Sequence, residues 1–210
     1  MGVWGRKHST EKTAGELRVK EQKSRRHEKR RIQSELELEK SLKWHLEEGV
    51  SYHCLSGGGV DSLSYLRCIV KEQKLEYVLI STWCMSAANI EEIYKWVGAG
   101  YIKRVDIYVG EIFKTSYGYE YEILKKNQKK YRNRLVIFKN HSKIISFIGE
   151  RYSGVIEASA NMNENPRMEQ AVITVDKELA MWYKNIFDEI ESWDKEIEQG
   201  EVYKWVDRTR

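Results

Sequence analysis

The chain has 210 residues, of which 41% are hydrophobic and 32% are charged, and its formal net charge is +4. This length and apolar content suffice for one domain with a real core plus an appendage. The sequence contains no run of about 18 apolar residues, so we expect no membrane-spanning helix. The three cysteines form no CxxC pair and lie in apolar runs, which favours reduced thiols in a cytoplasmic protein. No Cys/His cluster has the spacing of a zinc site, so we expect no metal.

The first part of the chain is basic and rich in helix formers. Residues 14–48 contain almost no helix breaker, and Gly49 follows as a stop signal. We therefore predict a long basic helical arm at 1–48, followed by a domain at 49–210. The densest basic run, RVKEQKSRRHEKRR, is typical either of a solvated helix face or of a nucleic-acid-binding surface, because Lys and Arg neutralise phosphates. In the second interpretation the contacts come from Arg25, Arg26, Arg30 and Arg31.

After the arm, short apolar stretches alternate with helical ones. The pattern predicts a strand at YHCL before a helix at 61–72, and a strand at YVLISTW before a helix at 88–97. A strand at IKRVDIYVG then precedes a basic helical stretch at 116–133. The strands RLVIFKN, KIISFI, YSGVIEASA and QAVITV follow in close succession, before a last helix from about 176 to 199. This order indicates an α/β fold with a mixed β-sheet sandwiched by helices.

A glycine-rich loop, SGGGVDS at 56–62, follows the first predicted strand. It resembles the SGGxDS signature of the PP-loop ATP pyrophosphatases, in which the loop and a helix N-terminus hold a pyrophosphate. The match is imperfect, because alignment on Asp61 places Gly57 where that family has its serine. The other interpretation, which we favour, is a glycine turn into a helix capped by Asp61, at the rim of a pocket. The residues of the possible phosphate loop are Gly57, Gly58, Gly59, Asp61 and Ser62.

A second motif lies in the stretch FKNHSKIISFIGERYSGVIEASANMNENPRMEQAVITV, residues 138–175. His141 and Lys143 match an HxK pattern, and Ser159 and Asn161 follow the histidine by 18 and 20 residues as SxN. Together they resemble the catalytic half-site of the phospholipase D superfamily, often called the HKD motif. The resemblance extends over roughly 77–190 and implies a phospholipase D-like sheet sandwiched by helices. HxK alone is weak, since it also occurs at His27 with nothing following it.

Two departures from the family pattern limit this resemblance. The family usually has Asp five residues after the Lys, where this chain has Ile148, and the Gly that precedes SxN is also missing. The missing Asp counts against full activity more than against the fold. Glu169 or Glu157 could orient the imidazole instead, as carboxylates do in many histidine sites.

The resemblance implies a mechanism that needs neither metal nor cofactor. A neutral imidazole attacks the phosphodiester and forms a phosphohistidine, while a lysine, an amide and a hydroxyl stabilise the charge on phosphorus. Family members build a full site from two half-sites, and this sequence offers one, so the second histidine must come from a twin chain. We therefore expect a homodimer in which two copies of His141 meet across a two-fold axis. The expected catalytic residues are His141, Lys143, Ser159, Asn161 and Glu169.

The basic segments favour DNA over lipid as the substrate of such an enzyme. The helical stretch near 125–134 is basic and carries an aromatic residue, which suits a nucleic-acid backbone, although a solvated helix fits equally well. Its expected contacts are Lys125, Lys126, Lys129, Lys130 and Arg132. The leading interpretation is thus a phospholipase D-like nuclease of a phage or mobile element, active in the bacterial cytoplasm. The alternatives are a catalytically decayed DNA-binding or assembly module on the same fold, and a PP-loop ATP pyrophosphatase.

Overall fold

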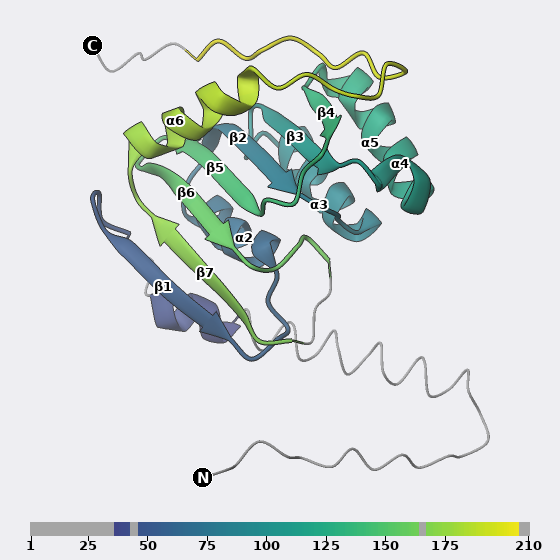
Figure 1. Cartoon of the computed structure of the whole chain (residues 1–210). Helices are drawn as coiled ribbons and strands as arrows, with labels where there is room; N and C mark the ends of the chain where they lie inside the picture. The colour runs from purple at the N-terminus through teal and green to yellow at the C-terminus, as the bar shows by residue number, and fades with distance from the viewer. Residues whose placement is uncertain (1–35, 43–45, 164–166, 206–210) are drawn as a thin grey trace, which may run out of the picture.

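The computed structural model of the chain describes residues 36–42, 46–163 and 167–205 (Figure 1). The predicted arm at 1–48 therefore lies largely outside the described residues, together with the predicted contacts Arg25, Arg26, Arg30 and Arg31; only 36–42, which is helical, and 46–48 are described. Within the described ranges no helix has both the length and the apolar character needed to cross a membrane.

The elements of the domain follow in the predicted order. The strands are β1 (Ser51–Ser56), β2 (Leu75–Thr82), β3 (Val105–Gly110), β4 (Leu135–Phe138), β5 (Ile144–Gly149), β6 (Ser153–Ala158) and β7 (Glu169–Thr174). The helices are α2 (Ser62–Glu72), α3 (Ala87–Gly98), α4 (Phe113–Ser116), α5 (Gly118–Tyr131) and α6 (Lys177–Asp188). Asp61, Ser86 and Asp176 cap α2, α3 and α6, because each side chain accepts a hydrogen bond from the backbone N–H three residues on.

The strands form one seven-stranded mixed sheet in the order β1-β7-β6-β5-β2-β3-β4. β2, β3 and β4 are parallel, whereas β5, β6, β7 and β1 join the sheet through antiparallel pairs. Because of these directions, the carboxyl ends of β1, β2, β3, β4 and β6 meet the amino ends of β5 and β7 at one edge. We call this edge of the sheet the carboxyl edge.

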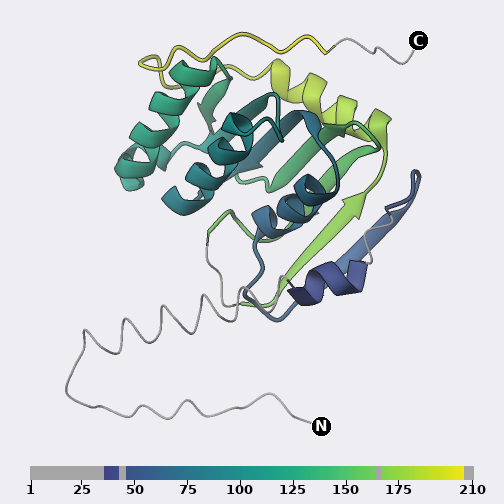
Figure 2. The same ribbon diagram turned by 180° about the vertical axis from the view of Figure 1, so that it is seen from behind.

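Apolar layers cover both faces of the sheet. Since successive side chains of a strand point to opposite faces, Val78 and Ile80 of β2 pack into the cluster that includes α2, α3 and α5. Tyr77 and Leu79 point the other way and pack with Ala180 of α6. Figure 1 shows α6 on one face, and Figure 2 shows α2, α3 and α5 on the other. The predicted mixed sheet sandwiched by helices is confirmed.

The segment 189–205 differs from the prediction that the last helix continues to about residue 199. It follows α6 as an irregular chain that runs along β4. The backbone N–H of Trp193 donates to the Ile137 carbonyl at 2.8 Å, and the N–H of Leu135 donates to the Gln199 carbonyl at 3.0 Å. These main-chain hydrogen bonds to β4 replace those of a helix, so tertiary pairing outweighs local helix propensity here.

Candidate functional site

The residues of the HxK and SxN motifs meet at the carboxyl edge. Residues 139–143 leave β4 and cross the ends of β3 and β2 to enter β5, so His141 lies on the rim of the sheet. Ser159 and Asn161 follow directly on β6, which is the antiparallel neighbour of β5. The backbone N–H of Ala158 donates to the Lys143 carbonyl at 3.0 Å, which extends this pairing beyond the assigned strands. Topology therefore brings together two motifs that are separated in the sequence.

His141 and Lys143 are in direct contact. Lys143 Nζ lies 3.1 Å from His141 Nδ1 and donates to the His141 carbonyl at 2.6 Å. The His141 side chain is exposed, and its ring also lies 5.5 Å from the Trp83 ring, centroid to centroid, at 52°. Partial burial lowers the pKa of the Lys143 ammonium, while the Cys84 thiol and the Glu169 carboxylate act in the opposite direction. The two motif residues thus form a cation–imidazole pair that is open to solvent.

Asn140 anchors the segment that carries His141. Its side chain is 4% exposed, and its Nδ2 donates to Ser81 Oγ at 3.0 Å and to the carbonyls of Thr82 and Tyr108. Its Oδ1 accepts from the Ser142 N–H at 2.9 Å, which closes an Asx turn around His141. Sequence reasoning missed this role. The signal available was an Asn two residues before a Ser, a common turn pattern that specifies no tertiary partner.

The SxN residues lie beside this segment, and each has a described contact. Asn161 Oδ1 accepts from Thr82 Oγ1 at 3.4 Å, at the end of β2. The exposed Ser159 hydroxyl donates to the Glu169 carboxylate. Glu169 also acts electrostatically on Lys143, which places all five expected catalytic residues around one stretch of the carboxyl edge.

The two carboxylates expected to orient the imidazole have other described contacts. Glu157 accepts from the Tyr183 hydroxyl at 2.6 Å, and Glu169 accepts from Ser159. Among the described residues, the ring of His141 contacts Lys143 and Trp83 rather than a carboxylate. Glu111 is the carboxylate bonded to this segment, because it accepts from the Asn140 N–H at 3.3 Å.

Ile148, where the family usually has Asp, lies at the far end of β5 from Lys143. It is 2% exposed and packs in the apolar cluster that includes Ala180 and Phe187 of α6. Its neighbours in the sheet are Tyr77 and Ser153. The departure from the family pattern therefore lies within the core, away from the exposed histidine.

The glycine loop forms the turn into α2, as we expected. Asp61 accepts from the Ser64 N–H at 3.0 Å and from Asn89 Nδ2 at 2.9 Å, so its carboxylate occupies the helix N-terminus where a phosphate would bind. The Ser62 hydroxyl donates to the Ala160 carbonyl at 2.5 Å. This hydrogen bond ties the start of α2 to the turn that carries Ser159 and Asn161.

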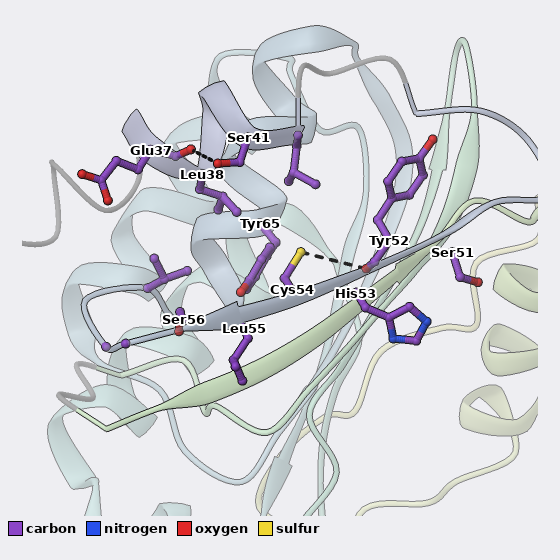
Figure 3. A pocket seen from close by; sticks show the side chains of 14 residues that line it. Glu37, Leu38, Ser41, Ser51, Tyr52, His53, Cys54, Leu55, Ser56 and Tyr65 are labelled. Carbon is purple, nitrogen blue, oxygen red and sulfur yellow. Dashed lines mark hydrogen bonds between the residues drawn. The ribbon is translucent and has the colours of Figure 1, made fainter. Parts of the chain in front are cut away.

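A groove opens beside this loop, between the helical segment 36–42 and β1 (Figure 3). Its volume is about 640 Å³, and its walls include Leu38, Cys54, Gly57 and Tyr65. Burial raises the pKa of the Cys54 thiol. Gly57 and Gly58 thus line a groove on the β1 side of the sheet, and none of the described HxK and SxN residues is part of its walls.

The basic side chains of α5 do not converge on His141. The helix begins near the carboxyl edge and runs back to the opposite edge, so its basic C-terminal half points away from the motif. Lys125 pairs with Glu122 at 3.5 Å, and Lys130 lies over the Tyr131 ring. A hollow of about 540 Å³ at that end is lined by Arg104, Gln128, Lys129, Arg132, Glu198, Gly200 and Glu201. The exposed lysine nearest in sequence to His141 is Lys139, which sequence reasoning did not single out.

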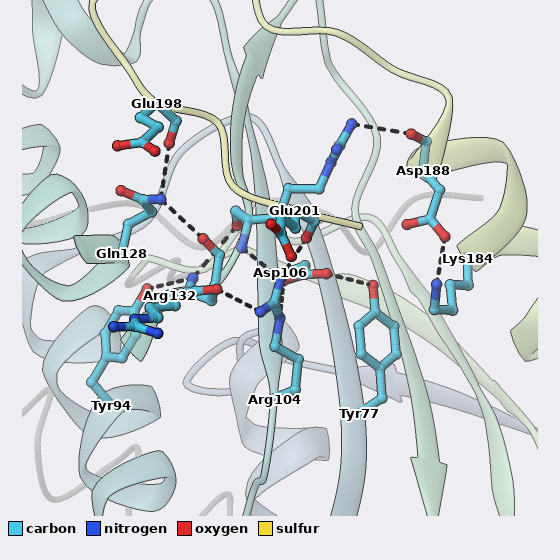
Figure 4. A network of polar contacts seen from close by, with 12 residues as sticks. Tyr77, Tyr94, Arg104, Asp106, Gln128, Arg132, Lys184, Asp188, Glu198 and Glu201 are labelled. Atoms are coloured by element: carbon cyan, nitrogen blue, oxygen red, sulfur yellow. Dashed lines mark hydrogen bonds and ion pairs between the residues drawn. The ribbon is translucent and has the colours of Figure 1, made fainter. Parts of the chain in front are cut away.

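A buried polar cluster, here called the Asp106 network, lies near the same opposite edge (Figure 4). Asp106 is fully buried and accepts from Arg104 Nε at 2.7 Å, from the Arg134 N–H at 2.8 Å and from the Tyr77 hydroxyl at 3.2 Å. The Arg134 guanidinium donates to the Asp188 carbonyl at 3.1 Å. Burial raises the pKa of Asp106, whereas Arg104 and the hydrogen bonds lower it. This network fastens the end of α6 to β3 and β4.

Within the described ranges, no three His, Cys, Asp or Glu side chains form a group that could hold a metal ion.

No protein-family description matches the sequence, and no curated protein is significantly similar to it. Several solved structures resemble the chain. The archaeal chromatin protein TrmBL2, reported to show a novel mode of DNA binding, is 14% identical with a TM-score of 0.47, and the match covers 82% of this chain and 65% of that one. Phosphatidylserine synthase of Haemophilus influenzae is 11% identical with a TM-score of 0.48, over 65% of this chain and 37% of that one.

Polyphosphate kinase of Porphyromonas gingivalis is also 11% identical, with a TM-score of 0.47, over 66% of this chain and 23% of that one. This chain thus spans less than two thirds of the length of each of the three proteins.

Proposed function

We propose that this chain is a phospholipase D-like phosphodiesterase that cleaves nucleic acid through a phosphohistidine, in a site that two copies of the chain complete. The observation that carries the proposal is the contact of an exposed imidazole with a lysine ammonium, 3.1 Å apart, beside the Ser159–Asn161 turn. A phosphodiester needs such a set: a neutral nucleophile, a cation for the non-bridging oxygens, and donors for the charge that develops on them.

Lys143 controls which nitrogen of His141 can attack. An ammonium has only hydrogens to donate, so His141 Nδ1 accepts from it, and the neutral ring then carries its proton on Nε2. A bound phosphate draws the ammonium onto its own oxygens. Nδ1 is then free to hold the proton, and the lone pair of Nε2 is free to attack phosphorus.

The reaction proceeds in two displacements. In the first, Nε2 of one His141 bonds to phosphorus and the P–O bond to the leaving group breaks. The protonated His141 of the other copy gives its proton to the departing oxygen. In the second, that now neutral histidine takes a proton from water, whose oxygen displaces the first histidine. The products are an alcohol and a phosphate monoester, and both rings return to their starting state.

Three side chains hold the phosphate during both steps. Lys143 pairs with a non-bridging oxygen, the Asn161 amide donates to another, and the Ser159 hydroxyl can turn from Glu169 toward the phosphate. Because the expected chemistry depends on these donors and on two imidazoles, turnover should persist when divalent metals are chelated.

The homodimer is part of the proposal. One half-site supplies a nucleophile but no acid for the leaving group, so a lone copy would react once at most. The exposure of His141 at the rim of the sheet leaves it accessible to a second copy. A two-fold axis beside this rim would bring the two rings to opposite sides of one phosphate.

A non-catalytic nucleic-acid-binding module on the same fold is the second candidate. The observation that favours it is Ile148, which replaces the family's Asp with an apolar core residue. This candidate predicts that the chain binds nucleic acid without turnover.

The test is phosphodiester hydrolysis in the presence of EDTA, measured on bis(p-nitrophenyl) phosphate and on plasmid DNA. Wild type, His141→Ala and Lys143→Ala are compared at equal concentration, and sedimentation confirms the state of each. We expect turnover in wild type that falls by on the order of 10⁴-fold in His141→Ala. His27→Ala, which alters the other HxK match in the sequence, is the matched control and should keep full activity. A verified dimer that binds DNA but shows no turnover would contradict the phosphodiesterase proposal and favour the non-catalytic binding module.

A further inference from the structure

The segment that carries His141 sorts its side chains between core and solvent. Asn140 is buried and Ser142 is half-buried, while Lys139 and His141 are exposed and Lys143 is half-buried. Lys139 and His141 therefore lie at the surface on either side of the buried Asn140, while Ser142 and Lys143 are both partly covered.

Hydrogen bonds from the Asn140 and Ser142 side chains hold the segment in this orientation. Asn140 is bonded to the ends of β2 and β3, and Ser142 Oγ lies 2.6 Å from Ser81 Oγ of β2. The segment therefore cannot rotate without breaking buried hydrogen bonds and leaving their partners unpaired. The positions of Lys139 and His141 relative to each other are set by this anchoring.

The Lys139 ammonium makes no contact within the described part of the chain. No described hydrogen bond, ion pair or ring contact involves its ammonium. The neighbouring carboxylate of Glu111 accepts from the Asn140 N–H instead. Lys143, by contrast, is already engaged with His141. A free, exposed cation thus stands two residues from the candidate nucleophile.

The direction of the 139–143 segment determines where the Lys139 ammonium lies along the carboxyl edge. The chain passes from the end of β4 to the start of β5, across β3 and β2, which is three strand spacings or roughly 14 Å. Lys139 lies at the β4 end of this path and Lys143 at the β5 end. A phosphate held by Lys143 for attack by His141 is therefore too far along the edge to be shared with Lys139.

We propose that Lys139 binds a second phosphate of the substrate, next to the one that is cleaved, so that the site selects a polyphosphodiester strand over a molecule with a single phosphodiester. The inference rests on the proposed function and specifies its substrate class. The strand lies along the carboxyl edge, with one phosphate at His141 and Lys143 and the next at Lys139. A phospholipid, which has one phosphodiester, would gain nothing from Lys139.

The test compares Lys139→Gln with wild type on two substrates in EDTA. The first is bis(p-nitrophenyl) phosphate, which has a single phosphodiester, and the second is a short fluorescent oligothymidylate. We expect KM for the oligothymidylate to rise roughly tenfold, the loss of one charge-assisted contact. Values for bis(p-nitrophenyl) phosphate should not change. Lys139→Arg keeps the charge and should restore the oligothymidylate KM.

Lys74→Gln is the matched control, because Lys74 is also exposed but lies at the opposite edge of the sheet, before β2. It makes the same change in net charge and should leave both substrates unaffected. Equal losses on both substrates, or no loss on the oligothymidylate, would overturn the inference.

Binding distinguishes a failure of this inference from a failure of the proposed function. The Kd of the oligothymidylate, measured by fluorescence anisotropy across a salt series, needs no turnover. Lys139→Gln should reduce the slope of log K against log salt by about 0.7, as expected for one phosphate contact on a single strand. An unchanged slope overturns the inference even in an inactive protein, whereas a reduced slope without turnover supports the contact of Lys139 with a phosphate and refutes the nuclease.

Discussion

The carboxyl edge and the Asp106 network are both dense in polar contacts, but they hold their charges in opposite ways. At the carboxyl edge, two neutral groups, the buried Asn140 and the half-buried Ser142, hold His141 at the surface. In the Asp106 network the charges themselves are inside, with Asp106 fully buried and paired to Arg104. The first arrangement leaves a histidine exposed at the surface, whereas the second uses charged groups to fasten elements together.

This difference shows that burial and a shifted pKa do not by themselves mark a functional site. Burial raises the pKa of Asp106, yet the carboxylate accepts hydrogen bonds from three neighbouring residues. The pKa of Lys143 is shifted too, but its ammonium lies near the surface beside the proposed nucleophile, His141. A perturbed group suggests chemistry only where it can reach a substrate.

The largest expected effect tests the structural role of the Asp106 network. Asp106→Ala leaves the Arg104 guanidinium without its buried partner, so we expect the free energy of unfolding to fall by about 3–5 kcal/mol in urea denaturation. Glu76→Ala removes the partner of Lys103 in an exposed ion pair and should cost roughly 0.5 kcal/mol or less. Equal losses of stability in the two variants would contradict the stabilising role of the Asp106 network. Loss of turnover on bis(p-nitrophenyl) phosphate in folded Asp106→Ala would contradict its separation from the candidate site.

The same residue gives the stability a pH dependence of known sign. Because burial raises the pKa of Asp106, the folded state binds its proton more tightly than the unfolded state does. Its contribution is therefore complete below the ordinary Asp range and is lost as the pH rises through the raised pKa. Asp106→Ala should lack this decline, which urea denaturation at a series of pH values would reveal.

The second effect concerns how neutral groups position the histidine. Asn140→Ala removes the anchor of the 139–143 segment, so we expect kcat to fall by roughly 10²-fold with little change in KM. Asn133→Ala is the matched control, since Asn133 is also a buried amide, bonded to Tyr94 in the region of the Asp106 network. It should lower stability and leave kcat intact. If both variants lose kcat alike, the carboxyl edge is not distinguished by positioning.

Local pattern accounts for much of the fold and for the identity of the motif residues. Short apolar stretches between helical ones predicted the strands, and Asp61 predicted the start of α2. The HxK and SxN spacings selected His141 and Asn161, which the fold brings to one edge because β5 and β6 are adjacent and antiparallel.

The features that the sequence could not show are contacts between residues that are distant along the chain. Nothing in the order of residues places Asn140 against Ser81, or the Trp83 ring against His141. The course of 189–205 depends on backbone hydrogen bonds to β4 and on the Ser192 hydroxyl, which accepts from the Ile137 N–H far away in the sequence. The basic residues of α5 stay a predicted nucleic-acid surface, and only the course of the helix shows that their half of it lies away from His141.

A smaller effect separates the two interpretations of the glycine loop. Asp61→Ala removes a helix cap and the partner of Asn89, so it should lower the free energy of unfolding by about 1–2 kcal/mol. Asp176→Ala removes the cap of α6 and should cost less. ATP should not raise the Tm of wild type. A rise in Tm that Asp61→Ala abolishes would instead make the loop a second phosphate site.

The smallest expected effect is a displacement of the pH–rate profile, and it tests whether the charge of Lys143 is used in the reaction. Partial burial lowers the pKa of Lys143, so its ammonium is lost at a pH below the usual value for lysine, and kcat/KM should fall there. Lys143→Arg keeps its charge at every accessible pH, so the basic limb should move to higher pH even if the rate at neutral pH decreases. Lys139→Arg, two residues before the histidine, should leave the limb for bis(p-nitrophenyl) phosphate in place. A basic limb that persists unchanged in Lys143→Arg would assign the limb to another titrating group. Lys143 would then have a structural role, like that of Arg104, which pairs with Asp106.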